Sequence, residues 1–149
     1  MRQGLRAVML ATLAAVGVVA CGGSDDGGPT GPSADPVVGS YDLFRVNGFS
    51  LPATFLLLDG STVTYFSGSG TAESNGRYSA TYATVINGIQ ATIVATGTWQ
   101  RTSSGYALAG TSTANGQPYG SSSGTASLNG GTLLINFPSS GFVEEWRRR

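Results

Sequence analysis

The sequence predicts an all-β fold, an antiparallel meander that closes into an up-and-down β-barrel of eight to ten strands. Three observations predict this fold. The turn dipeptide Asn-Gly recurs, apolar and polar residues alternate beside it, and the chain shows no helical periodicity after its first twenty residues. Asn-Gly favours two-residue hairpin turns because both of its residues readily adopt positive φ. Its copies are Asn47-Gly48, Asn75-Gly76, Asn87-Gly88, Asn115-Gly116 and Asn129-Gly130.

The alternation is clearest around Asn87-Gly88. After this turn, one face holds Ile89, Ala91, Ile93, Ala95, Gly97 and Trp99. Before it, one face holds Tyr78, Ala80, Tyr82, Thr84 and Ile86. A period of two over this length indicates strands with one face in a core and the other in water.

Further turns are expected at Asp59-Gly60, at 102–105 (TSSG) and at 138–141 (PSSG). An interruption is expected near Pro52. These signals delimit nine expected strands, at 39–46, 51–58, 61–73, 77–86, 89–101, 105–114, 117–128, 132–137 and 142–148.

Short connections make sequential strands antiparallel neighbours. An open meander would leave two edge strands with unpaired backbone groups. Pairing the first strand with the last removes both edges and closes the barrel. A β-sandwich built from the same hairpins is the alternative. The expected outward faces carry Thr, Gln and Ser, which disfavours a barrel that spans a membrane.

The N-terminus has the pattern of an export signal. Arg2 and Arg6 precede an apolar run at 7–20, which is short for a transmembrane helix. The run ends in Val18-Val19-Ala20-Cys21, which resembles the lipobox of bacterial lipoproteins. The alternative is an ordinary signal peptide followed by a coincidental cysteine.

The lipobox resemblance implies cleavage after Ala20, a diacylglyceryl thioether on Cys21 and acylation of the new amino terminus. Cys21 is the chain's single cysteine, so an internal disulfide is excluded. Several acyl chains would anchor the protein stably to a membrane. Gly22 follows the cysteine in place of the Asp that marks inner-membrane retention, so the resemblance implies the outer membrane of a two-membrane bacterium.

The expected organisation is therefore a signal peptide at 1–20, the lipidated cysteine and a flexible tether at 21–36, and a β-barrel domain at 37–149. The tether contains Gly, Pro, Ser and Asp and no large apolar side chain, so it cannot bury enough surface to fold. Asp25, Asp26 and Asp35 lack the spacing of a calcium loop.

The expected barrel resembles the small lipocalin-like β-barrel lipoproteins of uncharacterised function. The resemblance rests on an opening segment GSYDLFRVNGFSLPATF, on GTW at 97–99, on SGTASLNGGTLLINF and on a closing FVEEWRRR. The chain lacks the disulfide cysteines and the full length of true lipocalins. The resemblance implies a small barrel and leaves the ligand open.

Composition disfavours several function classes. From Cys21 onward, the chain contains six Arg residues and a total of eight Asp and Glu residues, so this part is slightly acidic. Nucleic-acid binding is therefore not expected. The Arg147–Arg149 cluster is either a solvated end or a contact for anionic lipid or sugar phosphates. The chain has no His and no Lys, which leaves no base for an activated nucleophile, and no helix-linked Ser elbow. We expect no enzyme activity, no metal and no cofactor.

Aromatic residues are the candidate ligand contacts. Tyr78, Tyr82, Trp99, Tyr106 and Trp146 are expected to line the interior or the mouth of the barrel. The alternative is that they only fill a narrow core. Glu144 shares a face with Trp146, and an inward-facing Arg101 would be its expected partner.

Two functions follow from these expectations. The first is a membrane-anchored, non-enzymatic barrel that binds a small apolar or amphipathic molecule. The second is a structural or envelope-interaction lipoprotein with a filled barrel. The Ser-rich strand at 121–127 also admits self-association, so the oligomeric state stays open.

Overall fold

Strands and short turns account for almost all of residues 34–149, which are the residues that the computed structural model describes. The fold class is all-β, as the sequence predicts. The strands are β1 (Gly39–Val46), β2 (Phe49–Ser50), β3 (Ala53–Leu56), β4 (Thr62–Ala72), β5 (Arg77–Ile86), β6 (Ile89–Thr102), β7 (Gly105–Ala114), β8 (Gln117–Asn129), β9 (Thr132–Phe137) and β10 (Phe142–Arg148). The expected signal peptide, Ala20, Cys21 and most of the expected tether lie outside the described residues.

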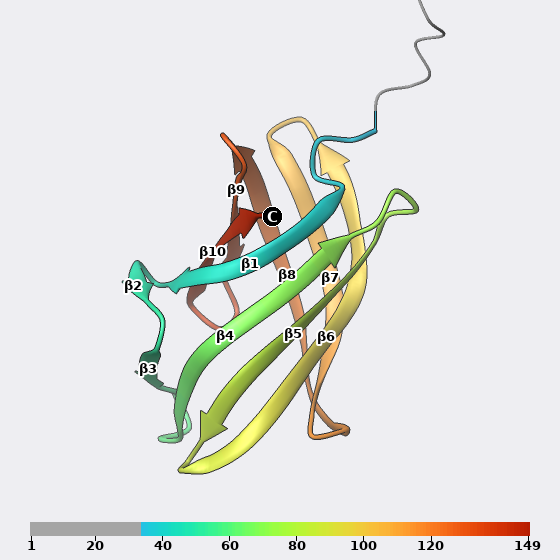
Figure 1. The fold of residues 1–149 in the computed structure, drawn as a ribbon. Coiled ribbons are helices and arrows are strands. Elements are labelled where there is room, and N and C mark those ends of the chain that lie inside the picture. Colours follow the sequence, from blue (N-terminus) through green and yellow to red (C-terminus); the bar gives the residue numbers. More distant parts are fainter. Residues whose placement is uncertain (1–33) are drawn as a thin grey trace, which may run out of the picture. The chain divides into compact units, whose positions relative to one another are not determined.

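Eight of the strands form a closed antiparallel barrel (Figure 1). From β4 to β10, each strand pairs with the next one in the chain. Strand β1 closes the ring because it pairs with the last strand, β10, and also with β4, where Gly39–Asp42 lie opposite Ser69–Ala72. The barrel is therefore the fold, and the β-sandwich alternative is wrong.

The expected second strand, 51–58, is the main departure from the predicted strand list. Two short strands replace it, β2 and β3, on either side of a cis peptide bond between Leu51 and Pro52. Strand β2 pairs with β1 and β3 pairs with β4, so both lie outside the ring of eight. The predicted interruption near Pro52 is confirmed.

Three Asn-Gly turns adopt the predicted conformation, with positive φ at both residues, and all lie at one end of the barrel, here called the Asn-Gly end. They are Asn47-Gly48, Asn87-Gly88 and Asn115-Gly116. Each Asn also accepts a hydrogen bond through its side-chain oxygen from a backbone N–H of a further strand, at Val143, Thr62 and Thr92 respectively. These turns therefore tie neighbouring hairpins together.

The other two Asn-Gly pairs differ, and they lie at the opposite end, here called the terminal end, where β1 begins and β10 ends. In the turn after β4, only Gly76 has positive φ, and Asn75 accepts a hydrogen bond from Arg77 N–H. Between β8 and β9, Asn129 pairs with Thr132, so the two turn residues are Gly130 and Gly131. The dipeptide thus marks a turn in all five places but a two-residue Asn-Gly turn in three.

Three β-bulges bend the strands, and each inserts one aromatic residue. The inserted residues are Phe44 in β1, Phe66 in β4 and Tyr119 in β8. A bulge shifts the alternation by one residue. Simple alternation would place Arg45 on the inner face with Tyr41 and Leu43, but the bulge at Phe44 places Val46 inside the barrel and leaves Arg45 exposed.

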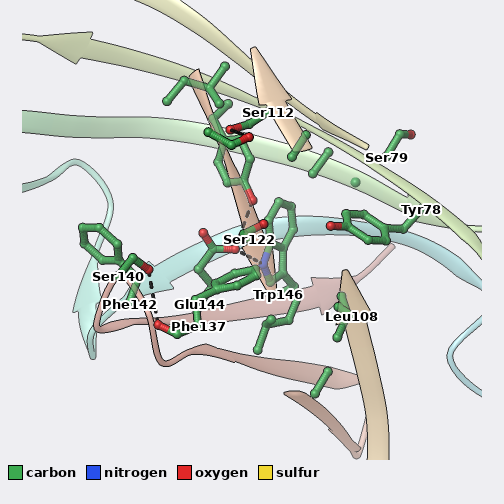
Figure 2. Close-up of a pocket in the computed structure, with 18 of the residues that line it drawn as sticks. Tyr78, Ser79, Leu108, Ser112, Ser122, Phe137, Ser140, Phe142, Glu144 and Trp146 are labelled. Atoms are coloured by element: carbon green, nitrogen blue, oxygen red, sulfur yellow. Dashed lines mark hydrogen bonds between the residues drawn. The ribbon is translucent and has the colours of Figure 1, made fainter. Parts of the chain in front are cut away.

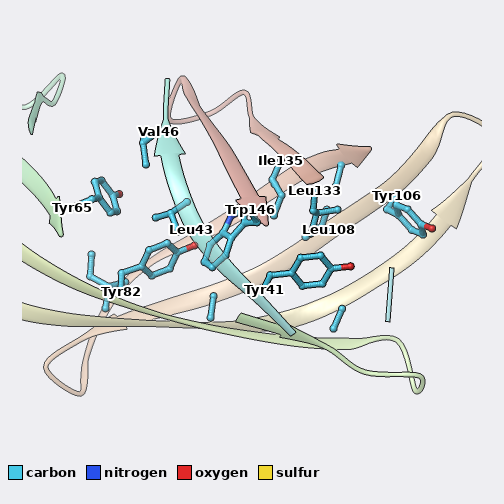
Figure 3. Close-up of a cluster of buried hydrophobic side chains, with 14 of the residues drawn as sticks. Tyr41, Leu43, Val46, Tyr65, Tyr82, Tyr106, Leu108, Leu133, Ile135 and Trp146 are labelled. Carbon is cyan, nitrogen blue, oxygen red and sulfur yellow. The ribbon is translucent and has the colours of Figure 1, made fainter. Parts of the chain in front are cut away.

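The core is the inner face of the barrel (Figure 3). The alternation predicted for β5 and β6 is confirmed, since Ala80, Tyr82, Thr84 and Ile93 are buried. Burial of large apolar side chains is the main stabilising contribution to such a fold. The largest aromatic side chains meet edge to face, as Tyr82 and Trp146 do with ring centroids 5.6 Å apart.

The wall of the barrel has unequal height. Strand β9 pairs with Thr125–Asn129 of β8, so the first half of β8 is paired with β7 alone within residues 34–149.

Among these residues, no helix is long and apolar enough to cross a membrane.

Candidate functional site

The barrel encloses a cavity of about 470 Å³ (Figure 2). This volume falls within the roughly 300–1,000 Å³ of small-molecule sites. All five aromatic residues that the sequence singles out border it, namely Tyr78, Tyr82, Trp99, Tyr106 and Trp146. These residues pack in the core and still leave space between them.

Glycines in the strands make room for two of these aromatic side chains. A Cβ at Gly68 or Gly70 would lie 3.2 or 3.3 Å from the ring of Trp146, closer than an ordinary contact. A Cβ at Gly97 would lie 2.7 Å from the ring of Tyr78, and one at Gly110 would overlap its hydroxyl. The GSG segment at 68–70 is therefore part of strand β4, where its two glycines leave space for the ring of Trp146. The next element in the chain is strand β5.

Glu144 is a buried acid in the cavity wall, with 5% of its surface exposed. Its Oε2 atom accepts hydrogen bonds from Trp146 Nε1 at 2.9 Å and from the Tyr82 hydroxyl at 3.1 Å. Burial raises the pKa of Glu144 to about 7, against the lowering effect of these two donors. Burial and the nearby Glu144 together raise the pKa of Tyr82 well above its ordinary value.

The expected pairing of Glu144 with Arg101 is wrong. Arg101 is exposed, and its guanidinium lies 3.5 Å from Asp35 instead. The face of β6 that points inward ends near Trp99, so Arg101 reaches solvent at the terminal end. Glu145 points outward, on the opposite face from Glu144, as expected for successive residues of a strand. Its carboxylate forms an ion pair of 3.6 Å with Arg45.

The terminal end of the cavity is closed. Buried side chains make up much of its wall there, among them Val37, Tyr41 and Tyr106. Asp35 fixes this closure, since it accepts a hydrogen bond of 2.7 Å from the Tyr106 hydroxyl and one of 3.0 Å from Val37 N–H. Burial alone would raise the pKa of Asp35, but these hydrogen bonds and Arg101 lower it below its usual range.

The Asn-Gly end of the cavity is open, and we call this opening the mouth. Exposed residues of three segments border it: Leu58 in the turn before β4, Tyr119 in the first half of β8, and Ser140 in the turn before β10. Leu58 is fully exposed and Tyr119 is 44% exposed. A solute would reach the interior from this side.

The cavity wall is mostly apolar, with one buried acid, Glu144, and a second acid, Asp59, at the mouth. Serine hydroxyls, such as those of Ser112 and Ser122, are the other small polar groups of the wall. Within residues 34–149, no three acidic or cysteine side chains cluster as a metal site. Tyr65 and Tyr119 also line the cavity, which the sequence analysis does not predict. Tyr119 is the inserted residue of a bulge, so the alternation of β8 does not indicate which way its side chain points.

Comparison of the chain with family models, with curated proteins and with solved structures gives no significant match. The small closed barrel itself agrees with the fold expected from the lipocalin-like resemblance.

Proposed function

We propose that this protein is a membrane-anchored lipoprotein whose non-enzymatic barrel binds a small apolar or amphipathic molecule in the cell envelope. The cavity of about 470 Å³, closed at the terminal end and open at the mouth, is the observation that carries the ligand-binding part. A purely structural barrel has no need of such a space, because a filled interior is more stable than a cavity.

The anchoring part rests on the sequence. The segment Val18-Val19-Ala20-Cys21 follows a basic and then an apolar region, and Gly22 favours the outer membrane. Cys21→Ser tests it: the wild type should incorporate labelled palmitate and sediment with outer membranes, whereas the variant should do neither. Equal labelling of the two proteins would refute lipidation at Cys21.

Ligand binding is tested by native mass spectrometry on the full-length protein extracted from its own envelope with a mild non-ionic detergent. A defined added mass that is lost on denaturation would support the proposal and identify the ligand class. The second candidate, a structural or envelope-interaction lipoprotein, would be favoured if only the bare protein mass appears and added apolar probes do not bind.

A further inference from the structure

We propose that the cavity selects amphipathic molecules with a cationic amine head, which the carboxylate of Glu144 binds. This inference rests on the proposed ligand-binding function and deepens it. It assigns the head group, whereas cavity size and apolar character alone would admit fatty acids, alcohols and amines alike.

The first argument is an acceptor atom that has no partner in the protein. Both hydrogen bonds to the Glu144 carboxylate, from Trp146 and Tyr82, end on Oε2, and no donor within residues 34–149 reaches Oε1. Among these residues, no fully buried side-chain oxygen or nitrogen lacks a hydrogen bond. Oε1 therefore has accessible surface, and Glu144 is one of the residues that line the cavity.

The second argument is the balance of charge. The cavity wall includes Glu144 and, at the mouth, Asp59, but no basic side chain. Arg45, opposite Glu145 on the neighbouring strand, forms an ion pair with Glu145 outside the barrel, and Arg149, which follows β10, forms one with Asp42. A buried carboxylate without a cation is costly, and an ammonium head would supply the missing charge, whereas a carboxylate or phosphate head would be repelled.

The third argument is the aromatic wall beside the acid. Tyr65, Tyr82 and Trp146 form a series of edge-to-face contacts, with centroids 5.8 and 5.6 Å apart. Figure 3 shows Tyr82 beside Trp146 in the interior. Aromatic faces attract cations, most strongly where water is excluded, so these rings favour the same head group as the acid does.

The phenols in the wall do not offer an alternative anion. Burial raises the pKa of Tyr65 and of Tyr78 above the ordinary value, so both remain neutral at physiological pH. Glu144, whose pKa is about 7, is thus the group deep in the cavity that can supply a negative charge to an amine.

The test uses the full-length protein in mild non-ionic detergent and three probes of equal chain length: dodecylamine, dodecanol and dodecanoate. Binding is measured by native mass spectrometry and by quenching of tryptophan fluorescence. We expect dodecylamine to bind at least about tenfold more tightly than dodecanol, with dodecanoate weakest. Dodecanol or dodecanoate binding as tightly as dodecylamine would overturn the inference and leave ligand binding intact.

Glu144→Gln keeps the shape of the side chain and removes its charge. It should lose the roughly tenfold preference for dodecylamine and leave dodecanol binding unchanged. The matched control Glu145→Gln, on the outer face of the barrel, should behave as wild type. An unchanged preference in a folded Glu144→Gln would overturn the inference. Failure of all three probes to bind wild type would overturn ligand binding itself.

Discussion

Trp146 donates a hydrogen bond of 2.9 Å to the carboxylate of Glu144, two residues before it on β10, inside the barrel. The two side chains meet because residues two apart on a strand share a face. The same carboxylate oxygen accepts a bond from Tyr82 on β5, which lies 62 residues away in the chain. One buried acid therefore connects two walls of the barrel that are not neighbouring strands.

The stability of the ligand-free protein should fall as the pH rises from about 4.5 to about 7. In this window Glu144 is ionised in the unfolded chain but holds its proton in the fold, where its pKa is about 7. The folded state then binds more protons, so each pH unit costs about 1.4 kcal/mol and the total is on the order of 3 kcal/mol. Denaturant titrations at pH 5 and pH 7.5 measure it.

Glu144→Gln is expected to abolish most of this slope, and the outward-facing Glu145→Gln to preserve it. The chain has no histidine, whose titration would otherwise fall in the same window. A wild type that is equally stable at both pH values would contradict a buried acid with a raised pKa.

Asn87→Ala should destabilise the protein by about 1–2 kcal/mol. Asn87 has a φ of 50°, which alanine tolerates poorly, and its side chain accepts the hydrogen bond from Thr62 N–H. Asn129→Ala is the matched control, because Asn129 lies at the end of β8 outside the positive-φ pair of its turn. The control should change stability by less than about 0.5 kcal/mol. Equal effects of the two substitutions on the urea midpoint would contradict the distinction.

Gly110→Ala should cost about 1–3 kcal/mol through overpacking. Its Cβ would overlap the Tyr78 hydroxyl and the carbonyl oxygen of Thr96. Gly120→Ala, on β8, places its Cβ no closer than 3.9 Å to Ser112 Oγ and should be nearly neutral. Thermal unfolding of both variants checks the difference, and an unperturbed Gly110→Ala would show that Tyr78 is not packed against β7.

Tyr106→Phe should lower the free energy of unfolding by about 1 kcal/mol, because it removes the hydroxyl that donates to Asp35. The exchange of the Val37 amide, which also donates to Asp35, should become faster. The depressed pKa of Asp35 makes this stabilisation present above about pH 3.8 and lost at lower pH, as the folded-state pKa is passed. Tyr119→Phe at the exposed mouth should leave both readouts unchanged.

Local signals in the sequence predict most of the strands. The expected bounds 105–114, 132–137 and 142–148 coincide with β7, β9 and β10. Alternation and turn dipeptides act over a few residues, so they can be recognised in a single sequence. The bulges at Phe44 and Tyr119 cannot be recognised in this way, because an inserted residue looks like any other member of an alternating run.

The sequence places part of the aromatic cavity wall correctly, but it does not predict the contacts within the site. All five predicted aromatic residues border the cavity, since inward faces follow from alternation. The partner of Glu144 did not follow, because the choice between Arg101 and Tyr82 depends on strand tilt and on where each side chain ends in space. Composition places Asp35 in the tether, but composition carries no information about its hydrogen bond with Tyr106.

The closed terminal end also governs the kinetics of any exchange with the interior. A cavity with one mouth is filled and emptied along the same path, so a bulky residue at that mouth slows association and dissociation by the same factor. Substitutions of side chains such as Leu58 at the rim would then change how long a molecule stays without changing the fraction of barrels occupied, whereas substitutions in the deeper wall would change both.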